Sequence, residues 1–463
     1  MSRPAGRPEH LRESARPAGG YVRTVIPVLP ATERALLARV AQAQRASRAP
    51  GLVAGVVRDG ALLWSVARGA VEEPHTDVQH RLGSITKSIT AVAVLRLRDE
   101  GLLHLDDPLD RHVPGTPLGD RTVGQLLSHT AGLTAESPGQ WWERTPGGTL
   151  ADLGLAPEHV PLGAGRRFHY SNLGYGVLGE VLARLRQRPW ADVVRDEVLL
   201  PLGMTRTTPR PSGRAASGWA VHPWADVLLP EPEHDHGVMA PAGQLWATLA
   251  DLARFAAFLL GDTGGVLDPG TLEEMAVPAG VDADGEGFAA YGLGLQSVRV
   301  GGRRLIGHGG SMPGFLAGVF VEPAAGAGAV SLRNATSGAD GGLLPDLLAL
   351  LAEHEPPVGP AWAPVPAAVD LDVLGPWYWG PAPYVLRLQA DGLLHLGGLG
   401  GPGRTSRFRQ RPDGSWVGLE GYFAGEVLTV TPELLQIATF VYTRTPYEPG
   451  QPVPGGLDPQ GWR

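Results

Sequence analysis

A serine and a lysine three residues apart, Ser84 and Lys87, lie in the apolar segment 82–95. On a helix this spacing places both side chains on the same side of one turn, so the hydroxyl and the amine would be neighbours. A serine hydroxyl is a weak nucleophile until a base removes its proton, and a desolvated lysine can be neutral near pH 7 and act as that base. A capped core helix explains the same pair when it stands alone, so the prediction of nucleophilic catalysis depends on further motifs.

Two further motifs supply residue types that could complete such a centre. Tyr170 and Asn172 lie in the turn before a predicted helix, a position from which side chains can project into a cleft. His308, Gly309 and Gly310 follow a short predicted strand. The two glycines would let the backbone of a substrate lie along the edge of this strand.

Other histidines of the chain have simpler explanations. His129 lies among hydroxyl residues in the segment 128–133, which favours a buried polar corner that braces the helix of the nucleophile. His234 and His236 have the spacing of metal ligands, but their loop is rich in Pro and Glu and holds no third ligand nearby. We therefore expect a solvated loop there, and neither a metal site nor a cofactor.

The elements around the motifs indicate an α+β fold. An amphipathic helix begins at Ala31, and Asp59-Gly60 joins two short strands in a tight hairpin. The segment from Ile85 to Gly101 predicts a helix with one apolar face and with serine and threonine hydroxyls capping its start. Further helices are expected at 123–128, 173–182, 249–260 and 343–351, and strands at 52–57, 61–66, 291–300, 304–307, 317–321 and 329–332.

Composition limits the classes of partner and compartment. The chain has 463 residues and a net charge of −8, which suggests neither nucleic acid nor an anionic membrane as a partner. It contains no cysteine, which excludes disulfides and cysteine nucleophiles. Neither a signal peptide nor an apolar run of transmembrane length is visible, so we expect a cytoplasmic protein.

The chain divides into four segments. Residues 1–30 predict a flexible arm, 31–352 a catalytic domain and 353–370 a Pro-rich linker. Residues 371–463 contain short strands separated by turns, which is typical of a small antiparallel barrel.

The three motifs stand in the order Ser84-x-x-Lys87, Tyr170-x-Asn172 and His308-x-Gly310. In this order and spacing the chain resembles the penicillin-recognising serine hydrolases, which include class C β-lactamases, DD-peptidases and related esterases. The resemblance implies a β-lactamase/transpeptidase-like fold, in which helices flank an antiparallel sheet and a helical subdomain is attached. The family usually has Lys-Thr-Gly where this chain has His-Gly-Gly, which argues against an efficient β-lactamase.

The C-terminal part is similar to the lipocalin-like barrel that follows the catalytic domain in some members. Its closing run 438–447 and its tail 454–463 are similar to those of stand-alone penicillin-binding-protein-type thioesterases, which cyclise nonribosomal peptides. That subfamily implies a peptidyl thioester as substrate, delivered by a carrier protein and ending in a D-configured residue. It also implies a barrel arginine that reaches into the cleft, and Arg444 is at the matching position.

The resemblance assigns roles to individual residues. Ser84 would attack the acyl carbon, Lys87 would remove its proton, and Tyr170 would pass a proton to the leaving group. Asn172 would hold this network and a substrate amide, whereas His308 would either orient the tyrosine or bind the acyl chain. The backbone N–H groups of Ser84 and Ser311 would form the oxyanion hole, and the substrate would contact Gly243, Gly309, Gly310 and Arg444.

The chemistry leaves two outcomes open. The acyl-enzyme can react with the peptide's own N-terminal amine and give a macrocycle, because an intramolecular amine has a high effective concentration. A cytosolic carboxylesterase or a D-amino-acid-specific peptidase would share every core motif and would release a linear acid.

Overall fold

The structure is a computed structural model in which the chain divides into two compact units, Met1–Pro357 and Val358–Arg463. It describes residues 28–165, 167–282, 289–338, 340–357, 361–400 and 403–446. The predicted arm up to residue 27 and the tail 454–463 lie outside the described residues. Each unit has a hydrophobic core of its own.

An eight-stranded antiparallel sheet forms the centre of the first unit. Its strands are β1 (Gly51–Arg58), β2 (Ala61–Gly69), β7 (Gly280–Asp282), β8 (Ala289–Tyr291), β9 (Gln296–Val300), β10 (Arg303–Met312), β11 (Phe315–Glu322) and β12 (Ala327–Arg333). Their order across the sheet is β2-β1-β12-β11-β10-β9-β8-β7. Asp59 and Gly60 both have positive φ, as the two-residue turn of the β1–β2 hairpin requires.

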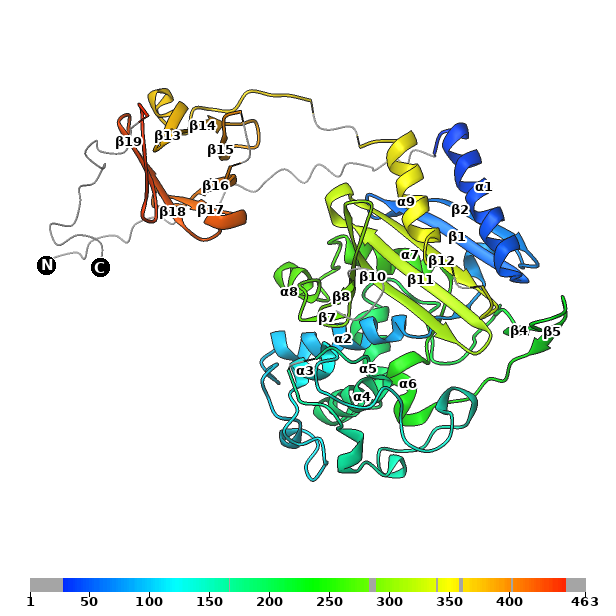
Figure 1. Ribbon diagram of the computed structural model, residues 1–463. Helices are drawn as coiled ribbons and strands as arrows, with labels where there is room; N and C mark the ends of the chain where they lie inside the picture. Colours follow the sequence, from blue (N-terminus) through cyan, green and yellow to red (C-terminus); the bar gives the residue numbers. More distant parts are fainter. Residues whose placement is uncertain are drawn as a thin grey trace, which may run out of the picture. The chain divides into compact units, whose positions relative to one another are not determined.

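Helices cover both faces of this sheet, as Figure 1 shows. The helices are α1 (Pro30–Ser47), α2 (Ile85–Asp99), α3 (Val123–Leu127), α4 (Asn172–Arg186), α5 (Trp190–Val194), α6 (Ala240–Gly243), α7 (Leu249–Leu259), α8 (Pro269–Met275) and α9 (Leu343–His354). In β1, Leu52 and Ala54 belong to the core under α1 and α9, whereas Val53 and Val57 belong to the core that contains α2 and α7. Because both faces are covered, the strand is a continuous apolar run rather than an alternating one.

Helix α2 differs from its sequence prediction in two respects. The expected single apolar face is wrong, because every residue from Ile85 to Leu95 is buried, with the helical subdomain on one side and the sheet on the other. The expected capping by side chains is also wrong, because the Ser84 hydroxyl makes no capping bond. The other hydroxyls bind neighbouring segments, since Thr86 Oγ1 accepts from the Leu245 amide and Ser88 Oγ donates to the Gly294 carbonyl.

The predicted strand 291–300 is two strands. Gly294 has positive φ in the segment between β8 and β9, so the chain turns there and pairs the two strands with each other. The other predicted strands and helices of the first unit are present, with ends that differ by a few residues. The short elements α5, α6, α8 and β7 were not predicted.

The second unit is a closed eight-stranded antiparallel barrel, as the turn spacing predicts. Its strands are β13 (Gly375–Trp379), β14 (Ala382–Leu388), β15 (Leu394–Gly398), β16 (Ser406–Gln410), β17 (Trp416–Gly418), β18 (Val427–Val430), β19 (Leu434–Ile437) and β20 (Phe440–Thr443). The sequence pattern predicts no strand at β13, which begins with Gly375-Pro376, and it predicts a single strand over 436–444, where the structure has β19 and β20. Ala438 has positive φ and makes the turn between those two. Among the described residues, no helix has both the length and the apolar character needed to cross a membrane.

Candidate active site

Ser84 and Lys87 lie at the start of α2 and contact each other directly. Lys87 Nζ donates to Ser84 Oγ over 2.9 Å and to the Ala242 carbonyl over 2.7 Å. The lysine side chain is fully buried, and this desolvation lowers its pKa to about 7, against the opposing effect of Glu136 and Glu143. In a large fraction of the molecules the Lys87 amine is therefore neutral at pH 7 and able to take the proton of Ser84.

Tyr170 is the third member of this group. Its phenol makes a hydrogen bond with Ser84, and Lys87 Nζ lies 5.1 Å from the centroid of its ring. Burial raises the pKa of Tyr170 above its ordinary value, although the bond to Ser84 works in the other direction. The phenol is therefore protonated at neutral pH and can pass a proton between the serine oxygen and a leaving group.

His129 holds the segment that carries Tyr170. Its ring centroid lies 4.2 Å from that of Tyr170, its Nδ1 accepts from the Ser171 amide over 3.0 Å, and its carbonyl accepts from the His169 amide over 2.8 Å. Burial lowers the pKa of His129 well below its usual value, so the imidazole is neutral. The sequence suggested a brace for the nucleophile helix, whereas these contacts fix the position of the tyrosine.

Asn172 lies beside the centre and is held by a carboxylate that the sequence analysis did not single out. Asn172 Nδ2 donates to Glu136 Oε1 over 2.8 Å, and Trp142 Nε1 donates to Glu136 Oε2 over 2.7 Å. Glu136 therefore fixes the asparagine amide and places a negative charge near Lys87. The loop of Glu136 and Trp142 gave no sequence signal beyond the neighbouring tryptophans at 141 and 142.

Strand β10 lies directly against the turn that precedes α2. A Cβ added to Gly310 would stand 1.8 Å from the Leu82 carbonyl oxygen, and one added to Gly83 would stand 2.5 Å from the Ser311 amide nitrogen. Only glycine allows two backbones to approach this closely. The contact brings the backbone of Ser311 beside Ser84.

The outer edge of β10 is open next to the nucleophile. β9 pairs with β10 only as far as Gly307, and the Gly309 amide donates to Gln296 Oε1 over 3.3 Å on that edge. Amides two residues apart on a strand point the same way, so the Ser311 N–H also points to the open edge. Together with the amide of Ser84 it forms a pair of donors suited to an oxyanion.

His308 is bound away from the nucleophile. Its Nε2 pairs with the Tyr291 hydroxyl at 2.9 Å and its Nδ1 with the Gly309 carbonyl at 2.5 Å. Burial lowers the pKa of His308 to about 3, so the ring is neutral, with Nδ1 as donor and Nε2 as acceptor. Its ring centroid lies 6.3 Å from that of Tyr170, so the histidine touches the tyrosine through packing.

A cavity of about 450 Å³ opens over these groups. Ser84, Tyr170, His308 and Ser311 line one part of it, and the rest extends over β10, β11 and β12. Gly243 lies behind this centre, where a Cβ would meet the side chain of Met312 at 3.0 Å. The residues of the three motifs therefore converge on one site, with Gly243 as packing beneath it.

Arg444 belongs to the second unit. Its guanidinium donates to the carbonyls of Pro432, Leu374 and Asp372 and lies 3.8 Å from the centroid of the Trp377 ring. These bonds connect the end of β20 to the segment before β13. The role of Arg444 in a cleft stays a prediction.

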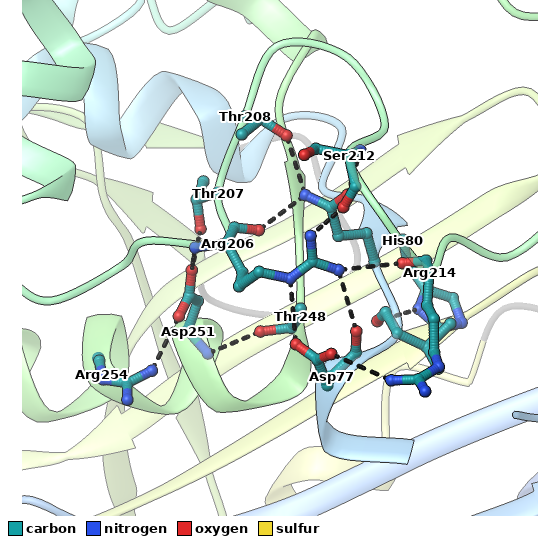
Figure 2. A network of polar contacts seen from close by, with 12 residues as sticks. Asp77, His80, Arg206, Thr207, Thr208, Ser212, Arg214, Thr248, Asp251 and Arg254 are labelled. Atoms are coloured by element: carbon teal, nitrogen blue, oxygen red, sulfur yellow. Dashed lines mark hydrogen bonds and ion pairs between the residues drawn. The ribbon is translucent and has the colours of Figure 1, made fainter. Parts of the chain in front are cut away.

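The nucleophile turn is supported by a separate polar network (Figure 2). Asp251 accepts from the Arg206 amide over 2.8 Å and from Thr207 Oγ1 over 2.9 Å, and it pairs with Arg254. The Arg206 guanidinium in turn binds Asp77 over 3.0 Å. Gln79 ties this network to β3 (His80–Arg81), the short strand that leads into Ser84.

His236 shows that the expected solvated loop is wrong at this residue. The side chain is fully buried and contacts the guanidinium of Arg81. The described residues contain no group of three or more His, Asp or Glu side chains that could hold a metal ion.

Comparisons with known proteins agree with this arrangement. Residues 36–353 match the family model described as Beta-lactamase, and residues 366–444 match DUF7586, a domain of unknown function. The human protein "Putative beta-lactamase-like 1" is 30% identical over 69% of this chain and 70% of its own length. The Dictyostelium discoideum "Beta-lactamase-like protein 2" is 27% identical over 50% of this chain and 46% of its own length. "Penicillin-binding protein 4" of Amycolatopsis lactamdurans is 29% identical over 48% of this chain and 62% of its own length.

Three solved structures extend the comparison. The octameric penicillin-binding protein homologue from Pyrococcus abyssi covers 88% of this chain and 99% of its own, with a TM-score of 0.62 and 20% identity, which shows the fold. SurE with D-Leu covers 90% of this chain and 100% of its own, with a TM-score of 0.56 and 26% identity. The match to a D-stereospecific amidohydrolase from Streptomyces sp. covers 69% of this chain and 98% of that protein's chain, with a TM-score of 0.59 and 25% identity. The β-lactamase/transpeptidase-like fold expected from the motifs is confirmed.

Proposed function

The chain belongs to the beta-lactamase family, and we propose that this serine hydrolase releases a peptide from a carrier-protein thioester by head-to-tail cyclisation. The observation that carries the catalytic part of this proposal is the 2.9 Å bond between Lys87 Nζ and Ser84 Oγ, made by an amine whose pKa is lowered to about 7. Such thioesters are made inside the cell, so the proposal includes a cytoplasmic location.

Acylation follows from the positions of these groups. Neutral Lys87 takes the proton of Ser84, and Ser84 Oγ attacks the acyl carbon. The carbonyl oxygen of the substrate then develops negative charge between the amides of Ser84 and Ser311. Loss of one such donor typically costs about 3 kcal/mol of transition-state stabilisation. Tyr170, bonded to Ser84, then delivers a proton to the departing sulfur.

The second step decides between a ring and a linear acid. If the acyl-enzyme meets water it gives an acid, and if it meets the peptide's own N-terminus it gives a macrocycle. A bound N-terminus has a high effective concentration, which favours ring closure in a cleft that excludes water.

The replacement of Lys-Thr-Gly by His308-Gly309-Gly310 supports a thioester donor. The neutral His308 is bound to Tyr291, and Gly309 has no hydroxyl, so this stretch of β10 offers neither a side-chain cation nor a hydroxyl to a substrate carboxylate. A thioester has no carboxylate at the scissile bond, so its binding requires neither this cation nor this hydroxyl.

Similarity to two solved proteins supports a D-configured acyl residue. SurE was solved with D-Leu, and its match covers 90% of this chain, which is more than the first unit alone. The Streptomyces amidohydrolase is described as D-stereospecific. We therefore propose that the residue whose carbonyl is attacked is a D-residue.

The decisive experiment is mass spectrometry of the products from a peptidyl thioester with a D-terminal residue. A product one water lighter than the linear acid is the expected macrocycle, and the L-terminal thioester should react more slowly. Ser84→Ala serves as the control for background hydrolysis. Linear acid as the sole product would contradict cyclisation.

A second function, a D-amino-acid-specific peptidase or carboxylesterase, is favoured by the D-stereospecific amidohydrolase among the similar structures. It predicts linear acid from esters and amides of D-residues. The same product analysis separates the two functions.

Arg444 provides a test that separates the cyclising role from simple hydrolysis. Arg444→Ala should lower the rate of cyclisation about tenfold more than the hydrolysis of a small ester, because only the peptide would contact the barrel arginine. Arg444→Lys is the matched control for charge. Equal losses on both substrates would make the arginine a structural residue of the barrel, in keeping with its bonds to barrel carbonyls.

A further inference from the structure

The open edge of β10 fixes the direction in which an acyl donor can pair. Ser311 presents its N–H and its carbonyl on the same edge, so one substrate residue can accept from the former and donate to the latter. Exchange of both bonds between two facing residues is the pairing of antiparallel strands. The part of the substrate that follows the scissile carbonyl then lies beside Gly309, two residues earlier in β10.

Gly309 has no free backbone group for that part of the substrate. Its N–H donates to Gln296 Oε1 and its carbonyl accepts from His308 Nδ1. Strand pairing therefore ends at Ser311. The leaving group and the attacking nucleophile are therefore recognised beside Gly309 by the shape of the site, without hydrogen bonds to the backbone of this strand.

A groove begins at this point and crosses the α9 side of the sheet. Gly309 faces Gly318 in β11, which faces Ser331 in β12, so all three lie on one face. A Cβ at Gly309 would meet nothing within 4 Å, whereas one at Gly318 would meet Leu344 Cδ1 at 2.7 Å. The space above Gly309 is therefore open, whereas Leu344 of α9 packs directly on Gly318 and forms the wall toward which the groove leads.

The far end of the groove is apolar. Leu316, Phe320 and Leu344 line it, and the same cavity of about 450 Å³ joins it to Ser84. Arg333 and Asp340 also line this cavity. The Arg333 guanidinium donates to the Gly338 carbonyl, its buried Nε has no hydrogen-bond partner among the described residues, and Asp340 pairs with Arg39. The part of the groove between Gly309 and the three apolar residues suits an uncharged, apolar side chain.

We propose that this groove is the acyl-acceptor subsite and that it selects an amine whose own side chain is apolar. The inference rests on the proposed function, because it names the nucleophile of its second step. The amine nitrogen bonds to the acyl carbon, the bond from that carbon to Ser84 Oγ breaks, and one amine proton returns to Oγ through Tyr170 and Lys87. In a peptide substrate the acceptor is the N-terminal residue, whose side chain lies over Gly309 and points toward Leu344.

The test measures how the acyl-enzyme divides between water and added amines. The donor is a small N-acyl-D-leucyl thioester, and the acceptors are glycinamide, leucinamide and phenylalaninamide at equal concentrations. The ratio of aminolysis to hydrolysis should be at least about tenfold higher for the two apolar amines than for glycinamide. Ser331→Leu, which fills the groove from its floor, should remove this advantage, and the matched Ser331→Ala, which leaves the groove open, should keep it.

Gly309→Ala provides a second variant, because its methyl group enters the mouth of the groove without a clash. It should lower the advantage of phenylalaninamide more than that of leucinamide. Equal ratios for all three amines with the wild-type enzyme, or ratios that neither filled variant changes, would overturn the subsite. Failure of the wild-type enzyme to form a covalent adduct on Ser84, checked by intact-protein mass spectrometry, would overturn the proposed function itself.

Discussion

Two polar clusters close to strand β3 differ in whether their buried charges have partners. Around Asp251, the carboxylate receives bonds from the Arg206 amide and from Thr207, and it pairs with Arg254. Around Ser84, the buried Lys87 has no carboxylate in contact, and its bonds go to a hydroxyl and a carbonyl. The Asp251 charge therefore has a cationic partner in contact, whereas the Lys87 charge has no anionic one.

The comparison shows which buried polar groups can do chemistry. In the Asp251 network burial raises the pKa of the carboxyl group, and the bonds from Thr207, the Arg206 amide and Arg254 oppose this effect. In the Ser84 cluster burial lowers the pKa of Lys87 to about 7 and raises that of Tyr170, and no residue in contact with Lys87 supplies an opposite charge. Perturbed groups that open onto a cavity are those a reaction can use, whereas a paired network has a structural role.

The largest effect expected from this contrast is the loss of the nucleophile. Ser84→Ala should lower kcat/KM for a thioester by about 10⁴-fold or more, because no other group can form the covalent intermediate. The free energy of unfolding should change by less than about 1 kcal/mol, because the Ser84 hydroxyl caps no helix. Steady-state kinetics and urea denaturation measure the two quantities, and residual turnover near the wild-type rate would refute the assignment.

The pH dependence of the Ser84 cluster gives the next effect. With neutral Lys87 as the proposed base, kcat/KM should rise about tenfold per pH unit below pH 7 and level off above about pH 8. The lysine pKa lies below its ordinary 10.5 in the folded state, so the unfolded chain binds more protons between pH 7 and 10.5 and stability rises with pH in that window.

Lys87→Met separates these two consequences. It should abolish activity at every pH and also remove this part of the pH dependence of unfolding. A flat activity profile between pH 5 and 8 in the wild-type enzyme would show that another group is the base.

The Asp251 network should respond in the opposite way. Asp251→Asn should lower the free energy of unfolding by about 2 kcal/mol, because it weakens bonds to the Arg206 amide and Thr207 and removes the charge that pairs with Arg254. The kcat of the folded fraction should stay within about twofold of wild type at 20 °C. Arg254→Ala, at an exposed partner, is the milder control. A large loss of kcat without loss of stability would end the distinction between the clusters.

His129 lies between the two clusters in character, and its replacement should have a moderate effect on activity. His129→Phe keeps a ring against Tyr170 but removes the acceptor of the Ser171 amide. We expect kcat to fall about tenfold with an unchanged KM, because the proton donor is misplaced while the groove is intact. A change confined to stability, with kcat and its pH profile unaltered, would make the histidine purely structural.

The sequence predicted the parts of the site that depend on local geometry. Ser84 and Lys87 meet because of helical spacing, and the tight turn at Asp59-Gly60 needs only two residues of suitable φ. The barrel also followed from turns spaced along the chain, although β13 was missed because its Gly-Pro start resembles a loop. The single apolar face of α2 was wrong, since the sequence does not tell how many sides of a helix are covered.

The remaining parts of the site depend on contacts between distant segments. His129 reaches Ser171 across 42 residues, and Asn172 reaches Glu136 across 36. Neither pair follows a spacing rule, so the sequence alone does not show that His129 holds the segment of Tyr170 or that Glu136 holds Asn172. The residue types Ser, Lys and Tyr pointed to the chemistry, and the tertiary structure supplied their supports.

The close approach of Gly83 to Ser311 and of Gly310 to Leu82 has a consequence for heat inactivation. The two amides proposed for the oxyanion hole belong to different elements, and the end of β10 that carries one of them is paired on one side only. Warming should loosen this strand end before the sheet melts, so catalysis should fail several degrees below the temperature at which circular dichroism reports unfolding. The temperature range of activity should therefore end when the contact between residues 82–84 and the end of β10 loosens, while the rest of the fold is still intact.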